Sequence, residues 1–423
     1  MKSILIIMAP TGSMHEGIRS VKQAKYLGRM GYGVSVLTPR RGDSSSVPFR
    51  GYDNVRFYEG SSFLRFLGSP FSRLFFNLTG RKKYRQLKID RFLGLENGPG
   101  LFLPLILEAI KLHRKKPFDV VITSSPPEAV HFVGIYLKRR FGCRWIADFR
   151  DLWSLYPGRY EPVSSMHAWL VKKVEGFMYK RSDELVHVTV PSTESVKKEF
   201  PCTKNKIHTI TNGYDPDDLR GTNRADFPGT SNSEGIKIGY LGGFEKPGRF
   251  PSVEFVTALR KVLDRGCHFV LHIWGTSSFS EELEKKVEGL GLGSVIVLHG
   301  HLPHRDAVQQ AAACDVLMVY MSDAREEYSL ITPQKFYHYL GMDKPILAFV
   351  PTEGIVADIV RETNSGYVAA PAVDDMEECL WRFLQCAQKD SLIFPISEEV
   401  AEFTLGYLTK RLAILFEDSL ISK

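Results

Sequence analysis

Short apolar runs alternate with amphipathic segments along the first half of the chain. Residues 4–8 form a continuous apolar run, and Val21, Ala24 and Leu27 then recur at helical spacing. Later apolar runs predict strands at 34–37, 120–123, 145–147, 185–188 and 207–210. The segments between them predict helices, among them 128–140, 166–179 and 193–200. Strands that alternate with helices predict βαβ units, in which a parallel sheet is covered on both faces.

A polar stretch rich in Gly, Ser, Asn and Asp, residues 217–235, interrupts this alternation and predicts an interdomain linker. The alternation then restarts. The second set of predicted strands is 236–241, 269–273, 295–298, 316–320 and 346–349, with helices near 281–288, 305–313, 334–340 and 355–363. We therefore predict an α/β protein with two Rossmann-like, doubly wound parallel-sheet domains, 1–216 and 236–397, facing a central cleft. The amphipathic segment 398–423 predicts a helix that packs across the domains.

One segment of the first half does not follow the alternation. Residues 61–91 contain five phenylalanines and eight Lys or Arg residues, but a single acidic residue, Asp90. Aromatic rings and cations together suit a membrane interface, because rings enter the headgroup zone while cations meet anionic lipid. The alternative is a helical insertion whose aromatic residues pack on the core, although Pro70 disfavours one continuous helix. Both interpretations treat residues 61–100 as an insert in the first domain.

Composition narrows the class of partner. The 423-residue chain has a net charge of +7 and a pI near 8.9, which favours phosphates or an anionic membrane surface. No nucleic-acid-binding motif is present, so we expect no nucleic-acid partner. Six scattered cysteines without a CxxC pair are typical of a reduced cytosolic protein. No apolar run resembles a signal peptide or a spanning helix of roughly 20 residues. These features predict a cytoplasmic protein, peripheral on the inner face of the membrane if it binds lipid.

The sequence offers no obvious metal site. No His or Cys cluster has metal-ligand spacing. The segment Asp215-Pro216-Asp217 has a D-x-D form, but it lies in an Asn-Gly turn at a domain boundary rather than after a strand inside a nucleotide-binding domain. We therefore expect neither a bound metal ion nor a cofactor.

Six short motifs occur in a consistent order along nearly the whole chain. They are Gly17-Ile18-Arg19 with GVSVLT at 33–38, ADFRDLW at 147–153, TNGYD at 211–215, GYLGG at 239–243, LHGHL at 298–302 with ACDV at 313–316, and PQKFYHYL at 333–340 with KPI at 344–346. Each is weak alone. Together they resemble the motifs of retaining glycosyltransferases of family 4, close to those that build bacterial surface polysaccharides. The resemblance implies the GT-B fold, a nucleotide-sugar donor, and a glycan or lipid-linked acceptor.

The second domain of such an enzyme has to stabilise negative charge on the donor. Negative charge develops on the diphosphate as the sugar leaves, and backbone N–H groups, helix N-termini and cations stabilise that charge. The layout of the chain and the resemblance together assign donor contacts to Gly242, Gly243, Lys246, Arg249, His301, Leu302, Thr332, Lys335 and His338. The alternatives are an ordinary βα turn at the glycines and solvated surface lysines at Lys246 and Lys335.

Fewer residues of the first domain are candidates. Arg150 and Asp151 follow a predicted strand, and Asp151 is placed to orient the acceptor or accept its proton. The alternative is a structural Arg–Asp pair. Gly12 and Gly17 would form the first glycine loop, in which His15 is a candidate acceptor contact.

The chain departs from the family pattern at one pair of positions. The family commonly carries two glutamates eight residues apart, and these positions hold Leu330 and His338 here. Leu330 cannot form a hydrogen bond to the donor sugar, whereas His338 can still donate to a ribose hydroxyl. Glu326 or Glu327 would have to supply the missing carboxylate. Two alternatives therefore stay open: a nucleotide-sugar epimerase on the same scaffold, and a non-catalytic partner of another transferase.

Overall fold

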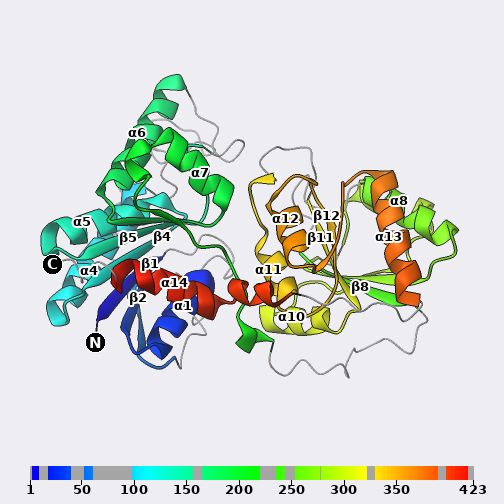
Figure 1. Cartoon of the computed structure of the whole chain (residues 1–423), viewed down its shortest axis with the longest axis horizontal. Coiled ribbons are helices and arrows are strands. Elements are labelled where there is room, and N and C mark those ends of the chain that lie inside the picture. Colours follow the sequence, from blue (N-terminus) through cyan, green and yellow to red (C-terminus); the bar gives the residue numbers. More distant parts are fainter. Residues whose placement is uncertain are drawn as a thin grey trace, which may run out of the picture. The chain divides into compact units, whose positions relative to one another are not determined.

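The computed structural model describes residues 2–8, 18–39, 52–60, 98–155, 164–219, 235–242, 253–276, 278–321, 329–388 and 397–417. The chain divides into two compact units (Figure 1). Unit 1 comprises Met1–Thr211 and Leu405–Lys423, and unit 2 comprises Asn212–Thr404. The end of the chain thus returns to the unit in which the chain begins.

Unit 1 contains a seven-stranded parallel sheet of order β3-β2-β1-β4-β5-β6-β7. Its strands are β1 (Ser3–Met8), β2 (Gly33–Pro39), β3 (Val55–Gly60), β4 (Val120–Ser125), β5 (Arg144–Phe149), β6 (Glu184–His187) and β7 (Ile207–Thr209). The hydrophobic pattern does not predict β3. This edge strand is only partly buried and carries Arg56 and Glu59 among its apolar residues, so it lacks the continuous apolar run of a central strand.

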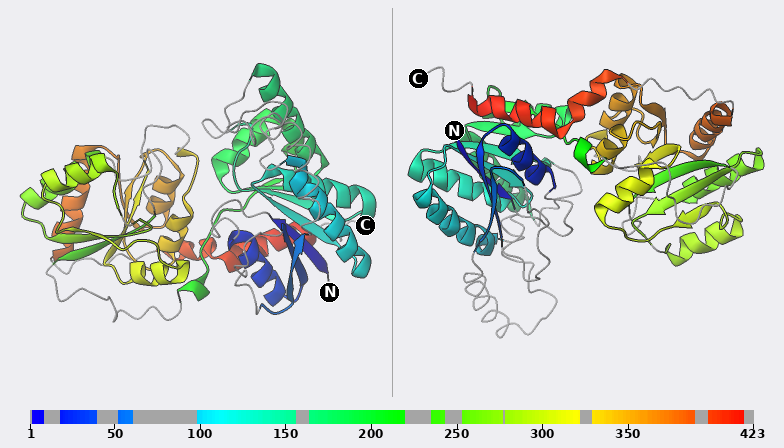
Figure 2. Two further views of the ribbon diagram at one scale, coloured as in Figure 1. Left: turned by 180° about the vertical axis from the view of Figure 1, so that it is seen from behind. Right: turned by 90° about the horizontal axis from the view of Figure 1, so that it is seen from below.

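Helices cover both faces of this sheet. They are α1 (Ile18–Arg29), α4 (Gly98–Lys115), α5 (His131–Phe141), α6 (Ser165–Arg181), α7 (Val190–Glu199) and α14 (Leu405–Glu417). α1 and α14 lie side by side on one face, where Leu27 and Leu412 join the same core cluster (Figures 1 and 2). The core on the other face includes Leu105 of α4 and Leu137 of α5.

The predicted C-terminal helix is not continuous. A 3-10 helix, Glu398–Phe403, precedes α14, and Thr404 between them has an extended backbone with φ −69° and ψ 137°. Thr404 forms a parallel bridge with Tyr214, and the Tyr214 N–H donates to the carbonyl of Phe403 at 3.0 Å. This long-range pairing, which an amphipathic pattern does not reveal, interrupts the helix.

Unit 2 contains a six-stranded parallel sheet of order β10-β9-β8-β11-β12-β13. Its strands are β8 (Ile236–Leu241), β9 (Phe269–Trp274), β10 (Ile296–Leu298), β11 (Val316–Tyr320), β12 (Ile346–Phe349) and β13 (Gly366–Ala369). Its helices are α8 (Val253–Asp264), α9 (Glu281–Gly289), α10 (His304–Ala312), α11 (Gln334–Leu340), α12 (Ile355–Glu362) and α13 (Val373–Gln388). One core cluster includes residues of α8, α9 and α13, and another includes residues of α10, α11 and α12, so this sheet too is covered on both faces.

Candidate functional site

The candidate donor site lies where the strand order of unit 2 reverses. Doubly wound sheets bind ligands beyond the carboxyl ends of the two strands at this switch point. In unit 2 these strands are β8 and β11, which are hydrogen-bonded neighbours. Gly242 directly follows β8, and α11 is the first described helix after β11.

Two predicted donor residues meet at this point. The Lys335 ammonium lies 3.6 Å from the centroid of the Tyr240 ring, a cation–π contact. A Cβ atom added at Gly242 would lie 2.9 Å from the same ammonium nitrogen. Gly242 has φ +151°, a backbone conformation that side chains rarely adopt. The structure thus places a cation beside an uncovered stretch of backbone.

A buried tyrosine holds this arrangement together. The Leu241 N–H donates to the Tyr339 hydroxyl at 2.7 Å, and burial raises the Tyr339 pKa well above its usual value. Tyr339 and Lys335 are four residues apart on α11, so they share one face of the helix. The hydrogen bond from β8 to Tyr339 therefore also orients Lys335 toward Gly242. The sequence analysis did not identify Tyr339, because this contact joins residues far apart in the chain.

Thr332 lies just before α11 and His338 lies within it, in different surroundings. The Thr332 hydroxyl oxygen is buried and has no hydrogen-bond partner in the part of the chain that the structure describes. Such an atom is costly to bury unless a ligand pairs with it. His338 is only 4% exposed. Leu330 lies in the short turn before α11.

His301 and Leu302 lie at the same edge of the sheet, beyond β10. The loops after β9 and β10 are joined, because the Gly275 N–H donates to the Gly300 carbonyl at 2.8 Å. The Gly242 N–H donates to the Trp274 carbonyl at 2.7 Å, which joins the loop after β8 to the end of β9. β8 and β10 flank β9, so their ends are about 10 Å apart. The described donor candidates therefore spread along one edge rather than converge on one atom.

In unit 1, Arg150 connects two loops at the carboxyl edge of the sheet. Its Nε donates to the Ser125 carbonyl at 2.8 Å, and a terminal nitrogen donates to the Pro126 carbonyl at 3.3 Å. These bonds join the segment after β5 to the segment after β4. Asp151 is the next residue and is half-buried. Arg150 thus has a structural role that positions its neighbour.

A buried glutamate that the sequence analysis missed holds the other end of this loop. The N–H and the hydroxyl of Ser154 both donate to one carboxylate oxygen of Glu175, and the Tyr179 hydroxyl donates to the other at 2.7 Å. Glu175 is fully buried, and burial raises its pKa. A signal was present in the sequence: Glu175 lies at helical spacing from the apolar residues Val171 and Met178.

A buried ion pair lies beside these loops. Arg19 and Asp148 are 3.5 Å apart, and both are almost completely buried. The Ser124 hydroxyl donates to Asp148 at 3.0 Å, and Arg19 donates to the Ile210 carbonyl at 2.9 Å. A buried pair of this kind fixes geometry more than it adds stability. It joins α1 to the ends of β4, β5 and β7.

Several predicted positions lie outside the described residues. They are Gly12, His15, Gly17, Gly243, Lys246, Arg249, Glu326 and Glu327, together with the aromatic-basic segment 61–91 and most of the predicted linker. Their roles stay predictions.

Neither a candidate metal site nor a membrane-spanning helix occurs in the described ranges. Within them, no three His, Cys, Asp or Glu side chains are grouped so that they could hold a metal ion. None of the helices in these ranges has the length and apolar character needed to cross a membrane.

The fold and the comparisons with known proteins define a class. The two parallel α/β sheets and the solved structures given below show the GT-B fold, and the family match over residues 20–218 indicates a glycosyltransferase. Residues 20–218 match the family described as Glycosyltransferase Family 4, which confirms the resemblance in this part of the chain.

Individual relatives agree with this class. The chain is 24% identical over 281 residues to the probable glycosyltransferase WbjE of Pseudomonas aeruginosa, covering 66% of this chain and 69% of that protein. The crystal structure of a glycosyltransferase from Rickettsia africae ESF-5 is similar, with a TM-score of 0.69, 14% identity and coverage of 100% and 99%. The structure of Anabaena Alr3699/HepE in complex with UDP-glucose has a TM-score of 0.61, 15% identity and full coverage of both chains. At these identities the two structures support the fold alone.

Proposed function

We propose that this glycosyltransferase moves a sugar, with retention at the anomeric carbon, from a nucleotide-sugar donor to a glycan or lipid-linked acceptor in the synthesis of a surface polysaccharide. The observation that carries the donor assignment is the Lys335 ammonium held beside Gly242. Retention and the acceptor class rest on the resemblance of the motifs. That HepE binds UDP-glucose supports a nucleotide-sugar donor for this chain as well.

The donor diphosphate is assigned to the edge between β8 and α11. The positive charge of Lys335 would offset the charge that develops on the leaving diphosphate, and Gly242, which has no side chain, would let the diphosphate approach. The Thr332 hydroxyl would donate to a phosphate oxygen, which would satisfy a buried polar atom. Arg249, predicted from the resemblance, would add a second cation. In this proposal these groups, rather than a metal ion, supply the positive charge.

The base and ribose are assigned to the same edge, toward β10. The loop at Gly300 would present backbone groups near His301 and Leu302 to the base. The spacing of about 10 Å between the ends of β8 and β10 leaves room for an extended ligand. His338 would contact the ribose only after a change of side-chain position, because it is almost completely buried.

The acceptor is assigned to unit 1. Asp151 lies in the loop that Arg150 and Glu175 fix at its two ends, so its backbone position is well defined. We propose that Asp151 orients the acceptor hydroxyl or accepts its proton. His15 would be a further acceptor contact.

Thermal melting against a panel of nucleotide sugars tests the donor assignment. A ligand that binds only the folded protein raises the melting temperature, by an amount set by its concentration relative to Kd. We expect one nucleotide sugar to raise the melting temperature of wild-type protein and to do so much less in Lys335→Gln. An unchanged response in Lys335→Gln would remove the lysine from the donor site.

Product analysis then separates the proposed activity from its rivals. Incubation with the best donor and polysaccharide or lipid-linked acceptors should yield a glycosylated acceptor with the α- or β-configuration of the donor sugar retained. An epimerised nucleotide sugar formed without acceptor would favour the epimerase. Donor binding without transfer or hydrolysis across the panel would favour a non-catalytic partner. This alternative arises because Leu330 replaces the glutamate that the family commonly carries.

A further inference from the structure

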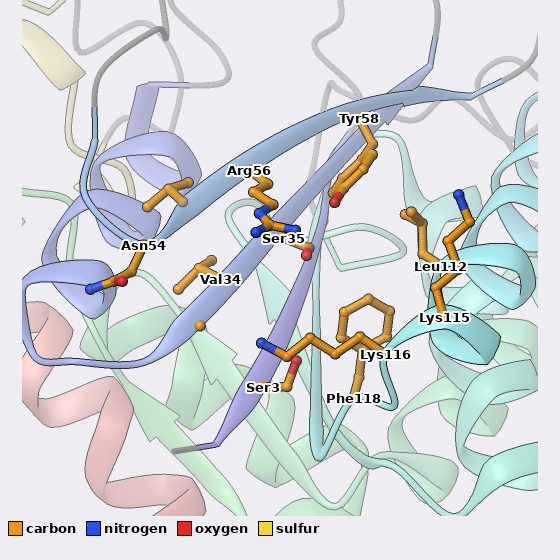
Figure 3. A pocket seen from close by; sticks show the side chains of 12 residues that line it. Ser3, Val34, Ser35, Asn54, Arg56, Tyr58, Leu112, Lys115, Lys116 and Phe118 are labelled. Atoms are coloured by element: carbon orange, nitrogen blue, oxygen red, sulfur yellow. The ribbon is translucent and has the colours of Figure 1, made fainter.

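A cavity lies at the opposite edge of the unit 1 sheet from Arg150 and Asp151. It has a volume of about 730 Å³ and is lined by residues at or before the amino ends of β1, β2 and β3 and near the end of α4 (Figure 3). This volume falls within the range of small-molecule sites. Ligands of doubly wound sheets usually bind at the carboxyl edge, so the usual site does not account for this cavity.

Three cations line the cavity, and none of the described residues that line it is acidic. Arg56 extends from β3, while Lys115 and Lys116 lie at the end of α4; Arg56 and Lys116 reach into the same space (Figure 3). Among the described residues, none of the three forms an ion pair or a side-chain hydrogen bond. Asp119 is nearby in the chain, but its carboxylate accepts the Ser3 N–H at 2.7 Å.

Two ordinary roles explain these cations only in part. Lys115 and Lys116 at the end of α4 complement the negative end of the helix dipole. Arg56 on an edge strand discourages pairing with another sheet. Neither role requires charges from two separate elements to border one cavity, where their mutual repulsion is a cost that an anion would relieve.

The remaining lining indicates which anion would fit. The Ser35 and Tyr58 side chains add hydroxyl groups on the sheet side. Leu112 and Phe118 add an apolar wall. An arginine matches the geometry of a phosphate by donating two hydrogen bonds, and a lysine adds a point charge. The lining therefore combines a phosphate-binding part with a surface for an organic group.

We propose that this basic pocket, lined by Arg56, Lys115, Lys116, Ser35, Tyr58 and Phe118, is a second ligand site for an organic phosphate. The phosphate lies between Arg56 and Lys116, and its organic substituent contacts Phe118. A phospholipid headgroup and a soluble phosphate ester share this chemistry. The site does not depend on the proposed transfer reaction, because its residues are separate from every donor and acceptor candidate.

Two probes distinguish the sources of the phosphate. Glycerol 3-phosphate, titrated by calorimetry, represents a soluble ester. Vesicles of phosphatidylglycerol and phosphatidylcholine in equal parts, compared with phosphatidylcholine alone in a sedimentation assay, represent a headgroup. The test variant is the double substitution Arg56→Gln/Lys116→Gln. The control is Lys111→Gln/Arg114→Gln, which removes the same charge from exposed positions of α4 that do not line the pocket.

We expect wild-type protein to bind one probe, with affinity that falls as salt concentration rises. The pocket variant should bind about tenfold more weakly, because it loses charge-assisted hydrogen bonds, and the control should stay within about twofold of wild type. If the pocket variant loses only its binding to vesicles, the ligand is a lipid headgroup. If it loses its binding to glycerol 3-phosphate, the ligand is a soluble ester. Equal losses in the two variants, or no binding by wild type, would overturn the proposal.

A further measurement separates this site from the donor site. The pocket variant should keep the full rise in melting temperature with the nucleotide sugar selected by the panel, because Lys335 and Gly242 are unchanged. Lys335→Gln should show the converse pattern, with probe binding intact and the donor response reduced. Loss of the donor response in the pocket variant would show that the pocket is not a separate site.

Discussion

The carboxyl edges of the two sheets are built in different ways. In unit 1, the loops after β4 and β5 are fixed by buried side chains, among them the Arg19–Asp148 pair and Glu175. In unit 2, the corresponding edge consists of glycine backbone and one half-buried lysine resting on Tyr240. The comparison teaches that the polar groups of unit 1 hold a loop in place, whereas unit 2 places a half-buried cation beside glycine backbone. Substitutions should therefore affect the two edges differently.

The largest effect is expected from Lys335→Ala. Removing a group that offsets charge on the leaving diphosphate should lower kcat/KM for transfer by about a hundredfold. The protein should keep its fold, because Lys335 is not part of the core clusters. Lys285→Ala is the control, since Lys285 is an exposed lysine that pairs with Glu281 within α9. Similar kinetics in both variants would contradict the phosphate role of Lys335.

A smaller loss should follow Gly242→Ala. The added Cβ would lie 2.9 Å from the Lys335 ammonium and 3.2 Å from Tyr240, at a φ of +151°. Such backbone strain costs roughly 1–3 kcal/mol. Its relief would displace the Lys335 ammonium from the donor diphosphate, so donor affinity measured by titration should fall about tenfold. Gly289→Ala, with no atom within 4 Å of the added Cβ and no positive φ, should bind donor normally. A normal affinity for Gly242→Ala would mean that the donor does not approach this backbone.

In unit 1, the comparison predicts that a substitution lowers stability directly and lowers activity only as a consequence. Glu175→Gln exchanges one acceptor oxygen for an amide that faces the Ser154 or Tyr179 donors. The free energy of unfolding should fall by about 1–3 kcal/mol in urea titrations, and kcat should fall severalfold as the loop loosens. Glu194→Gln, an exposed pair with Lys197 on α7, is the control. Unchanged kcat with reduced stability would limit Glu175 to a structural role.

The smallest effect on activity is expected from the last comparison, which concerns acid stability. Burial lowers the pKa of both His131 and His187 from the usual 6.5 to about 3. Each histidine is neutral when folded and takes up a proton more readily when unfolded, so stability is lost as pH falls from about 6.5 toward 3. We expect the melting temperature to fall between pH 7 and pH 5, and to fall less in His131→Gln/His187→Gln. An equal pH dependence in that variant would assign acid sensitivity to other groups.

The sequence predicted the central strands more accurately than the edges and the tertiary contacts. Residues 236–241, 316–320 and 346–349 were predicted as strands and are β8, β11 and β12, because buried parallel strands are continuous apolar runs. The edge strands β3 and β13 are only partly buried, and their patterns are correspondingly weak.

The residues of the candidate sites were also predicted better than the contacts between them. The glycine motif and Lys335 were predicted from the sequence, whereas the Tyr339 hydrogen bond that brings them together spans 98 positions in the chain. Glu175 could have been suspected from its place among apolar residues of α6, but its partner Ser154 follows from the fold alone. Residue types indicate chemistry, and long-range packing decides which of them meet.

The return of α14 to unit 1 has a consequence for biosynthesis. Leu405, Leu408, Leu412 and Phe416 complete the core over α1, yet they follow the whole of unit 2 in the chain. The whole of unit 2 is translated before they are available, and domains generally fold as units during synthesis. An apolar surface of the first-made unit therefore stays uncovered until unit 2 has been translated, and a nascent chain truncated before Leu405 would be a natural client for chaperones.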